Sequence, residues 1–173
     1  VAAAGTGDRL MALTDAADAA TRYFAVKALG GIKSGTRDPA AGEKLAAKLG
    51  DNEWLVRKAA AGSLGQLGDA NAIGPLVKLM LDPNAHQDWI AARALGAIGP
   101  AAVPALLDAV TANPRRAAPA VAALGDLAAP AAVPVLAAIA ADPKSDWQAR
   151  MQTMGALGKI GDAPAVDALI RTL

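Results

Sequence analysis

Apolar residues recur along most of this chain three and four positions apart, which is the spacing of one face of an α-helix. Leu55, Ala59, Ala60 and Leu64 form one such stripe, and another runs over residues 103–110. No segment alternates apolar and polar residues with a period of two, as a half-buried strand would. The pattern therefore predicts an all-α chain of about eleven helices, counting an opening one near residues 8–13.

A short phrase built on Leu-Gly returns five times along the chain. The leucines that anchor it are 35, 31, 29 and 33 residues apart. A period of this size is typical of stacked supersecondary units that bury a continuous core between neighbours. We therefore expect the anchoring leucines to be buried at equivalent places in the repeats. They are Leu29, Leu64, Leu95, Leu124 and Leu157.

Each repeat reads as two helices, here called helix A and helix B. Helix A ends at the Leu-Gly phrase, and a second glycine (Gly68, Gly99 or Gly161) fits the left-handed position that closes a helix. Prolines fall in the first turn of helix B, where a missing amide proton costs little. Helix A is expected to begin near an aspartate or asparagine that caps its free amides. These residues are Asp15, Asp51, Asp82, Asn113 and Asp142.

Composition favours thin layers of close-packed helices, because the chain holds 47 alanines and only 3% aromatic residues. The fold class predicted is an all-α, right-handed α-solenoid of about five two-helix repeats plus a leading half-repeat. We expect one domain over residues 1–173, with the half-repeat at 7–14 and repeats at about 15–50, 51–81, 82–112, 113–141 and 142–173.

Both ends of the sequence invite an expectation. The opening helix has no helix A of its own, and Leu173 ends an apolar stripe without a polar cap. We therefore expect further chain, or a partner, to cover one or both ends. The first residue is Val1, so a processed or trimmed start is expected, and the compartment stays open between cytoplasm and periplasm.

The segment from Asp51 to Asp69 closely resembles the short HEAT-like repeats, including the type named after phycobilisome lyases. Those repeats carry an arginine seven residues before the leucine. Arg22, Arg57 and Arg150 occupy that place here, whereas the third and fourth repeats depart from it. We expect these arginines to fix the stacking by reaching a carboxylate or carbonyl of a neighbouring repeat. For function the resemblance implies little, since the family spans scaffolds, lyase subunits and nucleic-acid enzymes.

The residue types needed for chemistry are scarce. The chain has no cysteine and a single histidine, His86, which argues against a zinc site, a thiol nucleophile or a disulfide. Its glycines close repeats and form no phosphate loop. The sequence therefore predicts no catalytic residue, no metal and no cofactor.

Binding residues are easier to nominate. Trp54 and Trp147 stand ten residues before their leucines, and Trp89 stands six before its own. They are expected to cover seams between repeats or to anchor a protein partner. Residues 117–141 hold one charge, so we expect an apolar contact patch there, with Ala132 and Ala138 pointing outward. The alternative is that this segment is only alanine-rich surface.

The sequence thus predicts a non-enzymatic protein–protein interaction scaffold, or an accessory or assembly subunit of a larger bacterial complex. A bilin-lyase-like subunit that handles a chromophore is one alternative, and a HEAT-like DNA-binding protein of the glycosylase type is another. The net charge of +1 and the mixed charges of the B helices argue against nucleic acid. No segment is long and apolar enough to suggest a transmembrane helix.

Overall fold

The computed structural model describes residues 2–32, 39–84, 86–114 and 117–172. Within these ranges the chain forms eleven α-helices joined by turns and short 3₁₀ segments, with no strand. The expected all-α repeat architecture is confirmed. The turn expected after Gly31, and Leu173, lie outside the described residues.

The chain divides into two compact units, Val1–Ile98 and Gly99–Leu173. We call them the N-terminal and C-terminal units. The division falls inside the third expected repeat, between its helix A and its helix B. The expected single domain and the repeat boundaries stay predictions, and each unit is described by itself below.

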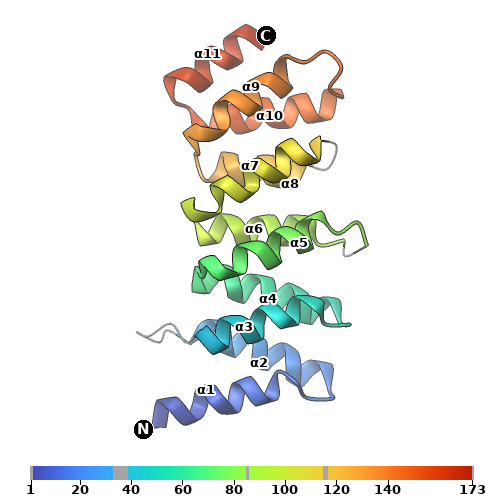
Figure 1. Cartoon of the computed structure of the whole chain (residues 1–173), viewed down its shortest axis with the longest axis vertical. Helices are drawn as coiled ribbons and strands as arrows, with labels where there is room; N and C mark the ends of the chain where they lie inside the picture. The colour runs from blue at the N-terminus through green and yellow to red at the C-terminus, as the bar shows by residue number, and fades with distance from the viewer. Residues whose placement is uncertain (1, 33–38, 85, 115–116, 173) are drawn as a thin grey trace. The chain divides into compact units, whose positions relative to one another are not determined.

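The N-terminal unit is a two-layer stack of helices (Figure 1). Helices A form one layer: α2 packs on α4, and α4 packs on α6. Helices α1, α3 and α5 lie against this layer as helices B. The helices of the unit are α1 (Ala2–Leu13), α2 (Ala19–Gly31), α3 (Pro39–Ala47), α4 (Trp54–Leu67), α5 (Ile73–Leu81) and α6 (Asp88–Ile98).

The C-terminal unit repeats the same arrangement. Helices α8 and α10 pack together as helices A, while α7, α9 and α11 form the layer of helices B (Figure 1). The helices of this unit are α7 (Val103–Ala112), α8 (Ala118–Asp126), α9 (Val133–Ala141), α10 (Trp147–Ile160) and α11 (Ala163–Thr172).

The core of each unit is built from leucines with alanines between them. The five repeating leucines of the A helices are 0–3% exposed. Four of the B helices, α3, α5, α7 and α9, each contribute one fully buried leucine to the same core. Alanine fills the remaining space without holding the backbones apart, so a composition poor in aromatics still gives closed packing. The B-helix leucines are Leu45, Leu76, Leu106 and Leu136.

The glycines expected to close A helices do so in two repeats. Gly68 and Gly161 adopt left-handed conformations, with φ of 61° and 66°. Gly99 also has a positive φ, 97°, but it precedes a 3₁₀ turn in an extended geometry. In the fourth repeat the same position is Ala128, which holds a φ of 46° without the freedom of glycine.

The residues expected to cap the A helices are wrong for every repeat. The helices begin three to six residues later, because the aspartates belong to the preceding turn. Asp82 and Asp142 end their B helices, and each accepts a hydrogen bond from the backbone two residues on. The actual caps are Asp18 and Asp146, which accept from the amides of Thr21 and Ala149 at 2.8 Å. In the other repeats, Glu53 precedes α4 without a side-chain cap bond, and Asn113 ends α7.

Candidate protein-binding surfaces

The arginine seven residues before the first repeating leucine joins two repeats. Arg22 donates from Nε and Nη2 to the two carboxylate oxygens of Asp51, at 2.9 and 3.0 Å, and from Nη1 to the carbonyls of Ala16 and Ala17. Both side chains of the ion pair are nearly buried, with 11% and 5% of their surface exposed. The pair therefore fixes the start of α4 on α2.

Electrostatics around this pair favour the ionised carboxylate. Burial raises the pKa of Asp51, but the hydrogen bonds from Arg22 and from the Glu53 amide outweigh it and hold the pKa below its usual value. Asp15 lies on the same unit and pairs with Lys44 and with Lys48, the latter at 2.7 Å. These contacts lower the pKa of Asp15 to about 2.

The other two arginines bind carbonyls instead of a carboxylate. Arg57 donates from Nη1 to the carbonyls of Asp51 and Asn52, in the turn before its own helix. Arg150 donates from Nε to the carbonyl of Ala140, at the end of α9. Through these contacts, all three arginines bind turns or helix ends of the stack.

In the C-terminal unit, α10 presents an exposed apolar stripe. Trp147 is 75% exposed and Met151, one turn later, is 57% exposed. Ala118 stands at the place of Met151 on α8, and both it and Ala122, one turn later, are half-buried. We call this surface the α8–α10 face. Among the described residues of α8 and α10, Asp126 and Lys159 form an ion pair at one edge of this face, and Asp146 stands at the start of α10. The other charged side chain of these helices, Arg150, is half-buried and donates to the carbonyl of Ala140.

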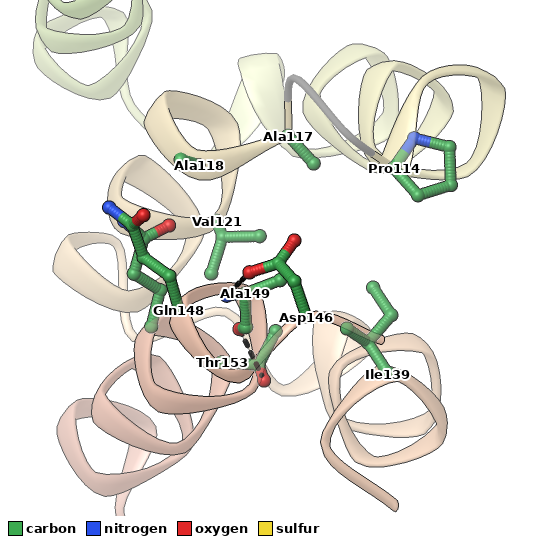
Figure 2. Close-up of a pocket in the computed structure, with 10 residues that line it drawn as sticks. Pro114, Ala117, Ala118, Val121, Ile139, Asp146, Gln148, Ala149 and Thr153 are labelled. Carbon is green, nitrogen blue, oxygen red and sulfur yellow. Dashed lines mark hydrogen bonds between the residues drawn. The ribbon is translucent and has the colours of Figure 1, made fainter. Parts of the chain in front are cut away.

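A cleft of about 160 Å³ opens beside this stripe, between α8, α9 and α10 (Figure 2). Helix α8 begins six residues before its leucine, whereas α10 begins ten before. Helix α8 therefore lacks a helical turn at the level where the first turn of α10 lies. Val121 and Ile139 supply apolar walls, and the side chains of Gln148 and Gln152 line the cleft on the α10 side.

The polar groups of the cleft are not equally available. The Thr153 hydroxyl donates to the carbonyls of Ala149 and Arg150, and one oxygen of Asp146 accepts from the Ala149 amide (Figure 2). The amides of Gln148 and Gln152 stand at the same wall. The cleft thus combines an apolar floor with amide groups suited to a peptide backbone.

One residue nominated for the contact patch is wrong. Ala132 is 0% exposed because it ends the 3₁₀ turn that leads into α9, where the chain enters the core. Ala72 and Ala102 occupy the same place in earlier repeats and are also buried. Ala138 is exposed on α9, in the other layer from the α8–α10 face. Part of segment 117–141, which holds a single charge, is therefore core.

In the N-terminal unit, Trp54 and Trp89 leave half of their surface exposed, 51% and 53%. The starts of their helices lie together, since the buried Gln87 side chain donates to the carbonyl of Trp54. The Lys58 ammonium lies 5.5 Å from the centre of the Trp54 ring. His86, directly before Gln87, is exposed. Every helix of the described ranges is too short or too polar to span a bilayer.

Sequence reasoning missed Met151, Gln148, Gln152, Lys58 and Arg93 as surface residues. The signal was present, because Met151 stands six residues before Leu157, as Trp89 does before Leu95. Comparing the outward positions of the repeats, as well as their buried leucines, would have found Met151.

The helical layers and their buried leucines define an α-solenoid repeat protein. A family model described as HEAT repeats matches residues 7–88 and 42–124, and one described as PBS lyase HEAT-like repeat matches residues 149–173. The chain belongs to the HEAT-repeat family.

A curated relative is the uncharacterized phycocyanin operon protein Z of Pseudanabaena tenuis. It is 31% identical over 163 residues, and the match covers 88% of this chain and 79% of the relative. This similarity covers most of the chain, so it supports the same family assignment.

Solved structures with the same fold include the complex of CpcE and CpcF of phycocyanin lyase from Nostoc, with a TM-score of 0.53, 23% identity, and coverage of 94% of this chain and 79% of that one. Human deoxyhypusine hydroxylase matches with a TM-score of 0.50, 21% identity, and coverage of 96% and 77%. A designed armadillo repeat protein gives 0.53, 17%, 95% and 87%. At these identities the likenesses show the solenoid fold alone.

Proposed function

We propose that this chain is a non-enzymatic accessory subunit that binds a protein partner through the α8–α10 face. The observation that carries the proposal is the exposed pair Trp147 and Met151 beside a cleft. The charged neighbour of Met151 on α10, Arg150, is half-buried and directs its Nε to the carbonyl of Ala140. Interface cores are enriched in tryptophan and methionine and depleted of charge, and contiguous exposed apolar surface marks a contact site.

The cleft suits one apolar side chain of a partner. Its volume of about 160 Å³ is below the ~300–1,000 Å³ that small-molecule sites usually offer. Gln148 and Gln152 would pair with the backbone on either side of that anchor. Trp147 would then pack beside it, in the arrangement of a buried hot spot with a polar rim.

The comparisons support an accessory role. The curated relative is named for the phycocyanin operon, and one structural neighbour is a complex of two proteins of phycocyanin lyase. The same two findings favour a second candidate, a lyase-like subunit that handles a bilin together with a partner. Because the cleft is small, it favours a site that a partner completes. It does not favour a chromophore that this chain holds alone.

The test is binding of a partner that has first been identified. The tagged chain is used to capture proteins from native extract at low salt, and mass spectrometry names those that are retained. Titration of the purified partner against Met151→Glu and Trp147→Ser should show Kd raised at least about tenfold, because a charge or a lost anchor falls in the interface core. Circular dichroism checks that both variants are helical.

Ala138→Glu on α9 is the matched control, since Ala138 is exposed in the layer of B helices. Its Kd should stay within about twofold of the parent, as exposed substitutions away from a contact change little. If Ala138→Glu weakens binding while Met151→Glu does not, the partner uses the B layer and the α8–α10 face is the wrong surface. Retention of added bilin through desalting, by this chain without a partner, would favour the second candidate.

A further inference from the structure

The outer surface of α2, α4 and α6 carries aromatic and basic side chains at matching repeat positions. Six residues before the repeating leucine stand Tyr23, Lys58 and Trp89. Two residues before it stand Lys27 and Arg93, with Gly62 between them in the middle repeat. Lys27, Lys58, Trp89 and Arg93 are exposed, and Tyr23 is half-buried. We call this surface the aromatic–basic face.

The lysines of this face lie over rings. The Lys27 ammonium is 5.7 Å from the centre of the Tyr23 ring, and the Lys58 ammonium is 5.5 Å from that of Trp54. Cation–π contact holds each charge close to the helix surface, where flexible lysines would otherwise extend into solvent. Phe24, 67% exposed, meets the Tyr23 ring edge-on at 5.2 Å and widens the apolar part of the face.

Carboxylates stay at the edge of the aromatic–basic face. Asp18, Glu53 and Asp88 all stand at the starts of their helices, and Asp18 is engaged in capping α2. Among the described residues, none of Lys27, Lys58 and Arg93 forms an ion pair with a carboxylate. Three cations, one on each neighbouring helix, are therefore left to attract an anion from outside.

We infer that the aromatic–basic face binds an extended, acidic segment of a protein that crosses α2, α4 and α6. Neighbouring helix axes lie ~8–10 Å apart, and a chain in the extended polyproline II conformation advances about 3.1 Å per residue and brings every third side chain to the same side. An acidic side chain at about every third position would then meet one cation per helix. Apolar residues between the acids would contact Phe24, Trp54 and Trp89.

An acidic protein segment fits this face better than a nucleic acid does. Single-stranded nucleic acid needs free ring faces for base stacking and a continuous basic track. Here lysines already cover one face of the Tyr23 and Trp54 rings. Among the described residues of this face, the exposed cations are Lys27, Lys58 and Arg93. Carboxylates joined by a flexible, partly apolar chain use the same cations without needing stacking.

The inference rests on the proposed function only in treating the chain as a protein-binding subunit. The α8–α10 face belongs to the other compact unit, so partner capture through Met151 and peptide binding here can fail separately. The probe is a synthetic peptide of about 12 residues with glutamate at every third position and glycine, serine and leucine between. A peptide of the same composition with its glutamates grouped at one end is the comparison.

Binding is followed by tryptophan emission in the Trp147→Phe background. Of the three tryptophans in the chain, only Trp54 and Trp89 then remain, and both lie on or beside the aromatic–basic face. The spaced peptide should change their emission and should bind at least about threefold more tightly than the grouped one. The double variant Lys58→Glu/Arg93→Glu should weaken binding at least about tenfold, and the milder double change to glutamine should weaken it less.

Lys78→Glu is the matched control, because Lys78 is an exposed lysine of the same unit on the B helix α5. It should leave the peptide's Kd within about twofold of the parent. Absence of peptide binding, equal affinity for the two peptides, or equal loss from Lys78→Glu overturns the inference. Tighter binding of a single-stranded oligonucleotide, lost in the Lys58→Glu/Arg93→Glu variant, would assign the face to nucleic acid instead.

Discussion

Directly after each repeating leucine stands a glycine, and in three repeats it lets two A helices approach closely. A Cβ placed on Gly30 would lie 2.2 Å from Cβ of Ser63, and one on Gly125 would lie 2.9 Å from Cα of Ala156. At Gly65 the nearest atom is Cα of Ala94 at 3.1 Å. In the last repeat Gly158 has nothing within 4 Å. Gly96, in the last A helix of the N-terminal unit, also has nothing within 4 Å. The first glycine of the phrase is therefore a packing residue where another A helix of the same unit follows it.

Gly125→Ala is expected to lower the free energy of unfolding by about 1–3 kcal/mol, because the backbone of α10 must move to admit the methyl group. Gly158→Ala is its matched control and should raise stability by up to about 1 kcal/mol, since alanine favours the helix. Urea denaturation of the two variants measures both. Equal effects from both changes would show that close approach at Gly125 is not what selects glycine.

Ala128 offers the opposite change. It holds a φ of 46° at the position where Gly68 and Gly161 close their helices, and its amide donates to the carbonyl of Gly125. Ala128→Gly should therefore raise the free energy of unfolding by about 1 kcal/mol, because glycine has no Cβ to strain there. Ala131→Gly, at an exposed neighbour in a 3₁₀ turn, should not. A thermal melt that moves the same way in both variants would contradict this account.

The two glycines of the phrase differ in how far the sequence reveals them. A glycine four residues after the leucine is recognisable from the chain itself, since helix ends have local rules. The role of the glycine after the leucine depends on which atoms lie opposite, in a helix some thirty residues away. That partner becomes known only when the repeats are stacked, so Gly30 and Gly125 could not have been distinguished from Gly158.

At the scale of elements, polar contacts connect the turns of one repeat to the helices of the next. Asp51 illustrates why the capping prediction was wrong. Its carboxylate accepts from the Glu53 amide, as in a local turn, and also from Arg22 of the preceding repeat. Sequence spacing correctly identified Asp51 as a turn residue, but the ion pair that occupies it is set by stacking.

Asp51→Asn should lower the free energy of unfolding by about 3 kcal/mol. The change removes one partner of a nearly buried ion pair and leaves the Arg22 guanidinium without its anion. Asp126→Asn is the control, because its pair with Lys159 is exposed and should contribute less than about 1 kcal/mol. Chemical denaturation at neutral pH distinguishes them, and similar losses would argue against a special place for the Arg22–Asp51 pair.

The same carboxylates predict how stability changes with pH. In the folded chain the pKa of Asp51 lies below its ordinary value of 3.8, and that of Asp15 is lowered to about 2. Groups with a lowered folded pKa stabilise the fold above their unfolded pKa, and this stability is lost as pH falls toward the folded value. Unfolding free energy should hold steady from about pH 7 to 5 and decline between about pH 4 and 2.

Asp51→Asn should flatten this decline, whereas added salt should act mainly on the contribution of Asp15. Asp15 is half exposed, so its pairs with Lys44 and Lys48 are screened by ions, and the nearly buried Asp51 is not. Urea titrations across the acid range, with and without salt, provide the measurement. An unchanged acid limb in Asp51→Asn would show that other carboxylates govern it.

The cleft of the C-terminal unit also belongs to the scale of elements. It exists because α8 begins later, relative to its leucine, than α10 does. Pro119 lies in the first turn of α8, but helix ends inferred from pattern alone are uncertain by about two to four residues. That uncertainty is about one helical turn, so the cleft could not be predicted.

For the whole molecule, the repeat period determined the fold class, while the surfaces required the structure. The five leucines and the two kinds of helix follow from periodicity alone. Exposure of Ala138 and burial of Ala132 do not, because both are alanines in the same apolar stretch after Asp126. Alanine is compatible with either environment, and its position relative to α9 decides between them.

Charge is balanced in each compact unit as well as in the chain. Residues 1–98 hold eleven basic and ten acidic side chains, and residues 99–173 hold six of each. Binding to duplex DNA should therefore be weak and non-specific near physiological salt, because few phosphates are neutralised at once and few counterions are released.

Fluorescence anisotropy with a labelled duplex at about 50 and 200 mM salt measures the affinity for DNA and its salt dependence together. We expect a Kd above about 10 μM at the higher salt and a log–log slope no steeper than about −3, the value for three cations such as those of the aromatic–basic face. Lys58→Glu/Arg93→Glu should reduce that slope by about 2, and Lys78→Glu should leave it close to the parent value. Submicromolar binding with a steeper slope would mean that the chain neutralises more phosphates than these three cations can. That result would favour a DNA-binding HEAT-like protein over the protein-binding subunit proposed above.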